Sequence, residues 1–90
     1  MLVIYPAVFH KESSSLWVEF PDLEGCQTCG ESLEEVINLT AEALGLYIVS
    51  LEENNTPVPI ATDIKMLTTD KDSFLSLVSC DINKYRRQTK

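Results

Sequence analysis

Residues 32–51 read SLEEVINLTAEALGLYIVSL, and this stretch has the pattern of an amphipathic helix. It opens with Ser32 and Glu35, a capping box in which hydroxyl and carboxylate satisfy backbone N–H groups that the first helical turn leaves free. Apolar side chains then recur at helical spacing and fall within an arc of about 140°. The residues of this stripe are Leu33, Val36, Ile37, Thr40, Ala41, Leu44, Tyr47, Ile48 and Leu51. We therefore expect one long helix with a core-facing side, ending near residues 54–55.

The opposite side of the expected helix carries apolar residues among glutamates. Leu39, Leu46 and Val49 lie there, with Glu42 between them. Exposed apolar residues inside an acidic rim are typical of a docking surface, but scattered surface hydrophobics are also normal. Both interpretations stay open, and these four residues are the candidate contacts on this side of the helix.

Three strands are expected before the helix and one after it. Residues 2–9 are rich in Val, Ile, Tyr and Phe, but Pro6 lacks an N–H, which either confines the strand to a sheet edge or puts Pro6 on the strand's non-bonded side. Residues 16–20 alternate, so that the side chains at 17 and 19 share one face. Residues 26–29 and 74–82 provide two further strands. The order βββαβ predicts an α+β fold, an antiparallel sheet with one long amphipathic helix packed on one face.

The composition is that of one small globular domain. Of the 90 residues, 44% are hydrophobic and 23% are charged, and no apolar run approaches the roughly 18 residues of a membrane span. The N-terminus lacks the layout of a secretory signal, so we expect a cytoplasmic protein. A domain this short buries only about 60–65% of its unfolded surface. A homodimer is therefore expected, with the edge strand containing Pro6 offering surface to the second copy.

The charge is distributed unevenly along the chain. The formal net charge is −7, but residues 1–62 contain one lysine and ten carboxylates, whereas residues 63–90 contain six basic and four acidic groups. An acidic body repels nucleic acid phosphates and favours a basic partner. Autonomous nucleic acid binding by residues 1–62 is therefore disfavoured. Arg86 and Arg87 in the basic tail are the candidate phosphate contacts, with a solvated chain end or stabilisation of a dimer as the alternatives.

The three cysteines are expected to be reduced thiols with a structural role. Cys26 and Cys29 have the spacing of half a zinc site or of a redox pair. Only Cys80 and His10 could complete a zinc site, and a redox pair would stand at a helix N-terminus that follows a buried strand. We therefore predict no metal ion, no cofactor and no catalytic residue.

An enzyme is the weaker hypothesis. With His10 as the only histidine, no Ser/His/Asp or Cys/His arrangement follows from the sequence. A metal-dependent nuclease needs several carboxylates that converge on metal ions, and Asp22, Glu24 and Asp81 are the candidates for that alternative. A second alternative is an orphan homodimer associated with RNA.

Two segments resemble the HicB antitoxin family. They are residues 5–9, YPAVF, and residues 17–26, WVEFPDLEGC. The resemblance continues through residues 30–35 and includes the paired prolines that follow the helix. It covers residues 2–60 well and the remainder loosely.

This resemblance implies a partly degraded RNase H-like fold that binds a small, basic, mRNA-cleaving toxin of the HicA type and covers its active surface. The contacts expected are Trp17, Glu19, Asp22 and Glu24 near the hairpin and turn, or the outer side of the helix. For Trp17, packing on the helix or at a dimer interface is the alternative.

Family members usually continue into a C-terminal DNA-binding domain of ribbon-helix-helix or helix-turn-helix type. The present chain stops at Lys90, and residues 84–90 resemble the basic linker that precedes such a domain. We therefore expect an antitoxin domain over residues 1–83 followed by a basic tail. DNA binding is expected only through a domain that this chain does not contain.

Overall fold

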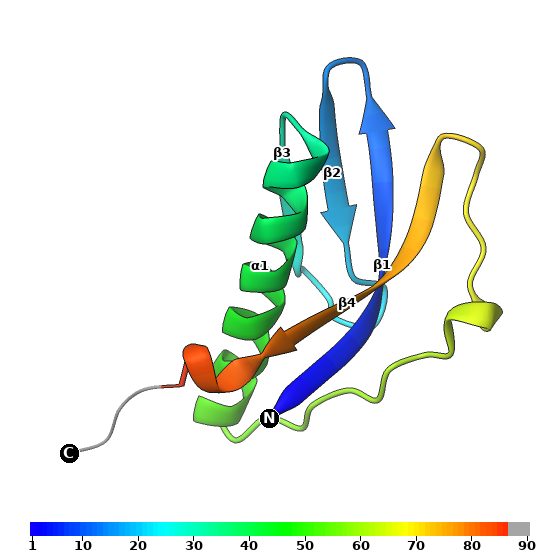
Figure 1. The fold of residues 1–90 in the computed structure, drawn as a ribbon. Helices are drawn as coiled ribbons and strands as arrows, with labels where there is room; N and C mark the ends of the chain where they lie inside the picture. Colours follow the sequence, from blue (N-terminus) through cyan, green and yellow to red (C-terminus); the bar gives the residue numbers. More distant parts are fainter. Residues whose placement is uncertain (87–90) are drawn as a thin grey trace.

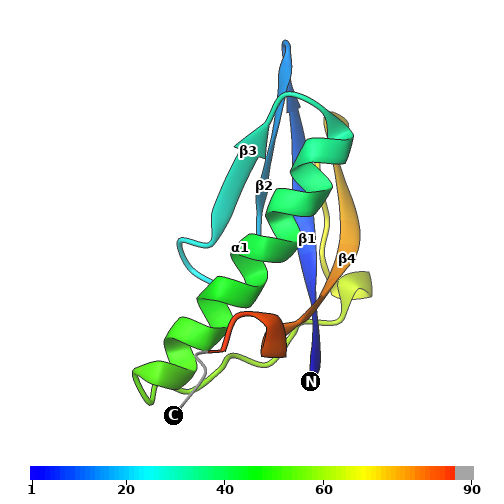
Figure 2. The same cartoon turned by 60° about the vertical axis from the view of Figure 1, so that its left-hand side comes forward.

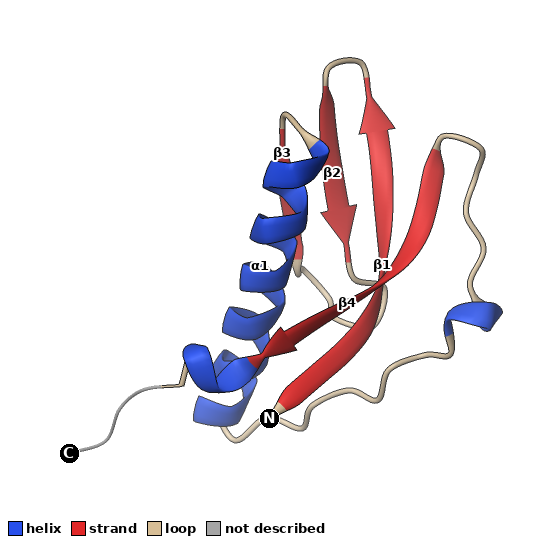
Figure 3. Ribbon diagram, in the orientation of Figure 1, coloured by secondary structure: helices blue, strands red, loops and turns tan. Residues whose placement is uncertain are grey.

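The helix expected from residues 32–51 is present as α1, which spans Leu33–Glu53 in the computed structural model of the chain; residues 1–86 are described. It packs against one face of a four-stranded antiparallel sheet (Figures 1 and 3). The strands are β1 (Leu2–Glu12), β2 (Ser15–Glu19), β3 (Gln27–Gly30) and β4 (Ser73–Asp81), and two short 3₁₀ helices are η1 (Ile64–Met66) and η2 (Ile82–Lys84). The predicted βββαβ order and α+β class are confirmed.

The first turn of α1 is capped much as the sequence predicts. The Ser32 hydroxyl accepts a hydrogen bond from the Glu35 N–H at 3.2 Å, and the Glu35 carboxylate accepts one from the Glu31 N–H at 2.8 Å. The helix ends at Glu53 with Asn54 as its C-cap, and Asn55 adopts a left-handed φ of 55°. Asparagine tolerates this conformation at a helix end, so the chain turns away before the prolines.

Of the two alternatives for Pro6, the edge strand is wrong, because the strand order is β3-β2-β1-β4, whereas a non-bonded side of the strand agrees with the register. β1 pairs with β4 along residues 2–10, but it pairs with β2 only from Val8 to Glu12. Pro6 therefore lies in the half of β1 that has a neighbour on one side only. Because β2 does not pair with β1 at Pro6, the missing N–H of Pro6 costs no hydrogen bond to β2.

The core lies between α1 and the helix-facing side of the sheet. Alternate residues of β1 and β2 supply that side, as the period of two along a strand requires. They pack against Val36, Leu44 and Ile48 of α1, all of which are fully buried. Leu33 and Ile37 were expected in the same stripe but are half exposed. Ile37 borders an opening of about 250 Å³ between α1 and β4, so its outer half meets solvent.

The connection over residues 57–72 runs on the side of the sheet opposite α1. In Figure 2, α1 lies in front of the sheet and the connection passes behind it. The connection is held in place by hydrogen bonds: the Tyr5 hydroxyl donates to the Pro59 carbonyl, and Thr62 donates to Asp22. The sheet is thus covered by a helix on one face and partly by a polypeptide strap on the other.

Candidate partner-binding surfaces

Trp17 lies on the sheet face that points away from α1. Its neighbour Val18 is fully buried in the core, so the alternation along β2 sends Trp17 to the opposite face. The indole stacks on the His10 ring with a centroid distance of 4.0 Å, and its Nε1 donates to the Glu12 carboxylate at 3.0 Å. The alternative that Trp17 packs on the helix is therefore wrong.

His10 links this tryptophan to two further polar side chains. Its Nε2 lies 2.7 Å from Glu19 Oε2, and its Nδ1 lies 2.9 Å from the Ser73 hydroxyl. We call His10, Glu12, Trp17 and Glu19 the His10 cluster. The sequence predicted a shared face for Trp17 and Glu19, but only the strand register could reveal His10 beside them.

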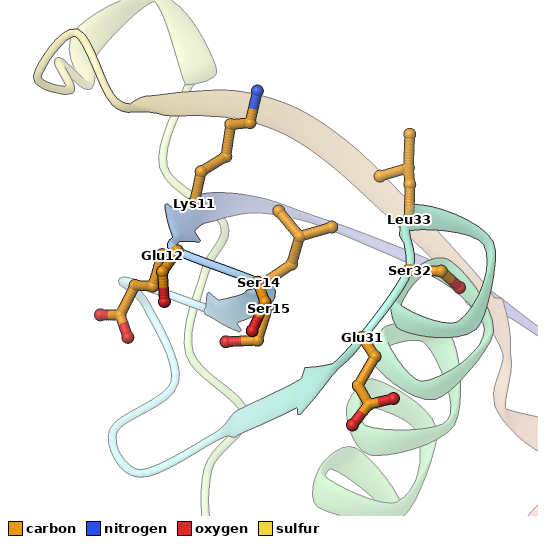
Figure 4. A pocket seen from close by; sticks show the side chains of 9 residues that line it. Lys11, Glu12, Ser14, Ser15, Glu31, Ser32 and Leu33 are labelled. Atoms are coloured by element: carbon orange, nitrogen blue, oxygen red, sulfur yellow. The ribbon is translucent and has the colours of Figure 1, made fainter.

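Two hollows border the His10 cluster. One, of about 630 Å³, is lined by Glu12, Trp17, Gln27 and Cys29 on the exposed face of β2 and β3. The other, of about 420 Å³, lies between the hairpin tip and the first turn of α1 (Figure 4). Its lining combines Lys11 with the carboxylates of Glu12 and Glu31. Glu12 contributes to both, so an acidic and aromatic surface extends from the hairpin tip across the sheet.

Asp22 serves the fold. Its carboxylate accepts hydrogen bonds from the backbone N–H of Thr62, at 2.9 Å, and from the Thr62 hydroxyl, and thereby fastens the connection to the turn after β2. The same carboxylate, together with burial as the larger cause, raises the pKa of Tyr5. Asp22 is half-buried and turned toward its own chain.

Replacing Asp22 with alanine is expected to destabilise the protein by about 1–3 kcal/mol, because two donors of Thr62 lose a charged acceptor. Asp22→Asn keeps one acceptor oxygen and should cost less. The measurement is the free energy of unfolding in urea. The matched control is Glu24→Ala, an exposed position in the same turn, where a loss equal to that of Asp22→Ala would contradict this structural role.

Glu24 is exposed, and the turn that carries it is tied to α1. The Tyr47 hydroxyl donates to the Glu24 backbone carbonyl at 2.8 Å, which leaves the side-chain carboxylate facing outward. Gly25 follows with a φ of 81°, a conformation that side chains rarely adopt. The expected turn residues are thus divided, with Asp22 used by the fold and Glu24 at the surface.

The outer side of α1 matches the predicted docking surface only in part. Leu46 is 51% exposed and Glu42 is exposed, while Leu39 is half-buried. Val49 was expected on this surface, but it is only 5% exposed and belongs to the core. It lies one helical turn from Gly45 and from Glu52, the residues that the C-terminal segment contacts.

The C-terminal segment packs against α1 through two residues. A Cβ atom added to Gly45 would stand 2.5 Å from the Tyr85 ring, so the ring lies directly on the glycine. Arg86 forms two hydrogen bonds with the Glu52 carboxylate, at 3.1 Å from Nε and 2.9 Å from Nη2, and these lower the pKa of Glu52. The guanidinium predicted to contact nucleic acid is therefore engaged within the chain. Arg87 lies outside the described residues.

The three thiols form no disulfide in the part of the chain that the structure describes. All three cysteines are free there, with Cys26 and Cys80 buried and Cys29 exposed. Burial raises the pKa of the Cys26 thiol to about 11, which suppresses the reactive thiolate. The interpretation of Cys26 and Cys80 as structural thiols agrees with this burial.

The carboxylates named for a nuclease centre contact separate segments. Asp22 binds Thr62, whereas Asp81 binds the N-terminal amine at 3.2 Å. Over residues 1–86, no group of three or more His, Cys, Asp or Glu side chains could hold a metal ion. No helix in the same range combines the length and the apolar composition needed to cross a membrane.

Comparison with known proteins relates this geometry to a family. The chain is similar to a protein in the Streptococcus pneumoniae toxin–antitoxin complex, with a TM-score of 0.87 and 30% identity over 100% of this chain and 76% of that chain. It is also similar to a chain of the HicA3 and HicB3 toxin–antitoxin complex, with a TM-score of 0.73 and 25% identity over 88% of this chain and 99% of the other.

A relative and a family description complete the comparison. A 14.9 kDa protein from the rep-hol intergenic region of Haemophilus phage HP1 is 25% identical over 83 residues, which cover 89% of this chain. The present chain spans only 62% of that phage protein. Residues 5–90 match the family described as the HicB-like antitoxin of bacterial toxin–antitoxin systems. The chain therefore belongs to the HicB-like antitoxin family.

Proposed function

We propose that this protein neutralises a small, basic, RNA-cleaving toxin of the HicA type by covering the toxin's active surface with the His10 cluster. The observation that carries the proposal is the placement of Trp17, stacked on His10 and flanked by Glu12 and Glu19 on an open sheet face. Aromatic side chains are frequent anchors of protein interfaces. Carboxylates around such an anchor complement lysine and arginine on the partner.

Charge explains how such a surface competes with RNA. A toxin that cleaves RNA must present basic groups to phosphates, and the same groups are attracted by carboxylates. Residues 1–62 supply ten carboxylates against one lysine. Association with the toxin should therefore be fast at low ionic strength and slow down as added salt screens the charges.

The alternative docking surface within the same function is the outer side of α1, with Leu39, Glu42 and Leu46. It is acidic and partly apolar, but neither Leu39 nor Leu46 lines either of the two hollows beside the His10 cluster. The hollow beside Trp17 can receive a side chain of the partner. For this reason the sheet face is the stronger candidate.

Trp17→Ala is expected to weaken toxin binding by about 30-fold, the loss of roughly 2 kcal/mol that is typical of an aromatic anchor. The measurement is isothermal titration calorimetry with a catalytically inactive HicA-type toxin from the same source, together with inhibition of RNA cleavage by the active toxin. Leu46→Ala on α1 is the control and should change the affinity less than about threefold.

Two results would count against the proposal. If Leu46→Ala weakens binding strongly and Trp17→Ala does not, the docking surface is α1. If the folded wild-type protein neither binds the toxin nor protects RNA, the proposed function is wrong. Circular dichroism checks that Trp17→Ala is folded; if it is not, Glu19→Lys on the same face replaces it and should weaken binding by charge reversal.

We further propose that the protein forms a homodimer and that residues 1–83 are its toxin-binding domain. In this proposal the basic residues after Arg86, rather than all of residues 84–90, act as a linker, and operator DNA is bound by a separate domain. The contacts of Tyr85 and Arg86 with α1 support a linker that starts after these two residues. The small core of a 90-residue chain supports association with a second copy.

A further inference from the structure

The two edges of the sheet differ in length and in chemistry. β3 occupies one edge with four residues, and β4 occupies the other with nine. β4 reads SFLSLVSCD, so its single charged residue is Asp81 at the very end, and it contains no lysine, arginine or proline. Natural proteins usually protect a long edge strand with such residues, because an unprotected one pairs with another strand.

The outer side of β4 is open to such pairing. Over residues 1–86, no turn or loop forms a backbone hydrogen bond with residues 74–80. Two apolar side chains of the strand are exposed, Leu77 at 56% and Phe74 at 40%. The opening of about 250 Å³ between β4 and α1, bordered by Ile37, adds further uncovered apolar surface beside the strand.

The charge of the protein indicates which strand fits this edge. A basic partner is attracted to carboxylates, and residues 73–80 of β4 have none. Two copies of a protein with a net charge of −7 repel one another, so their contact is least unfavourable where neither carries charge. β4 is also the one edge of nine residues among the described strands. A β4 strand from a second copy therefore matches it in both length and charge.

From these observations we infer that β4 pairs antiparallel with β4 of a second copy, with Leu77 at the two-fold axis. Leu77 is the central residue of β4, and an antiparallel strand pair about a two-fold axis brings identical residues together. The product is a continuous sheet of order β3-β2-β1-β4-β4-β1-β2-β3. This inference rests on the proposed homodimerisation and assigns its surface.

The first test is cross-linking by cysteine. Directly opposed residues of an antiparallel pair have Cβ atoms about 4.5–5.5 Å apart, which is close to the separation in a disulfide. In a Cys29→Ser background, Leu77→Cys should form a covalent dimer on mild oxidation, visible on a non-reducing gel. Leu46→Cys, an equally exposed leucine on α1, should stay monomeric. Equal cross-linking at both positions, or none at Leu77, would overturn the inference.

The second test is charge at the axis. Leu77→Lys places two ammonium groups opposite each other, which should raise the dimer dissociation constant at least about tenfold, as measured by sedimentation equilibrium. Leu46→Lys should leave the constant unchanged. A dimer that survives Leu77→Lys would overturn the assignment to β4 but not homodimerisation, and a monomeric wild-type protein would overturn both.

The same variants separate this inference from the proposed function. Because Leu77 lines neither of the two hollows beside the His10 cluster, Leu77→Lys should bind the toxin with wild-type affinity per chain. A wild-type protein that dimerises through Leu77 but ignores the toxin would support the β4 assignment and contradict the proposed function. Toxin binding by a protein without β4-mediated dimers would support the proposed function and overturn the β4 assignment.

Discussion

Leu44→Ala is expected to destabilise the protein by about 2–5 kcal/mol, the cost of removing a fully buried leucine from a core. Leu44 is 0% exposed and lies in the middle of the contact between α1 and the sheet. Domains of this kind are held folded by only about 5–15 kcal/mol. The variant should therefore unfold at a much lower urea concentration, with a single cooperative transition followed by circular dichroism.

The matched control stands two residues further along the same helix. Leu46 is 51% exposed, so Leu46→Ala should change the free energy of unfolding by no more than about 0.5–1 kcal/mol. The two variants delete the same atoms from the same helix, so helix propensity cancels between them. Similar losses at both positions would contradict the burial of Leu44.

The second large effect concerns Gly45, where two physical effects oppose each other. Helix propensity alone would make a helix with alanine at this position about 1 kcal/mol more stable than the helix with glycine. Against this, a Cβ would stand 2.5 Å from the Tyr85 ring and 2.8 Å from the Cys80 sulfur. Cys80 is buried in the core and cannot withdraw without moving its neighbours. We therefore expect Gly45→Val to destabilise the protein by about 1–3 kcal/mol through overpacking.

The test of Gly45 uses urea unfolding with two comparisons. Ser50→Val, at an exposed position on the same helix, should cost only the few tenths of a kcal/mol due to propensity. Combining Gly45→Val with Tyr85→Ala removes one of the two obstructing groups, so the valine should cost less in that background. A stabilised Gly45→Val protein would show that the C-terminal segment does not pack there.

The features predicted correctly from sequence are those set by neighbours along the chain. The period of the apolar residues and the chemistry of Ser32 and Glu35 specify α1 almost to its bounds, because capping and amphipathicity are local. Alternation in β2 likewise predicts that Trp17 and Glu19 share a face. The fold class follows once these elements are placed in order.

The features predicted wrongly depend on segments distant in sequence. Val49 is buried, and it lies on α1 between Gly45 and Glu52, which Tyr85 and Arg86 contact from more than 30 positions away in the sequence. Ile37 is half exposed because the helix leaves an opening beside β4. Pro6 does not mark an edge strand, because β1 pairs with β2 on one side and with β4 on the other, although β2 ends before it reaches Pro6. The partnership of His10 with Trp17 likewise requires the register of β1 on β2, which no local pattern contains.

The exposure of Cys29 has a practical consequence. In the register of β2 and β3, Cys29 stands directly opposite Trp17, and both line the same hollow. The other two thiols are buried, with pKa values raised by that burial. A maleimide fluorophore added to the native protein should therefore attach selectively at Cys29, giving a reporter whose emission responds when a binding partner covers the neighbouring indole.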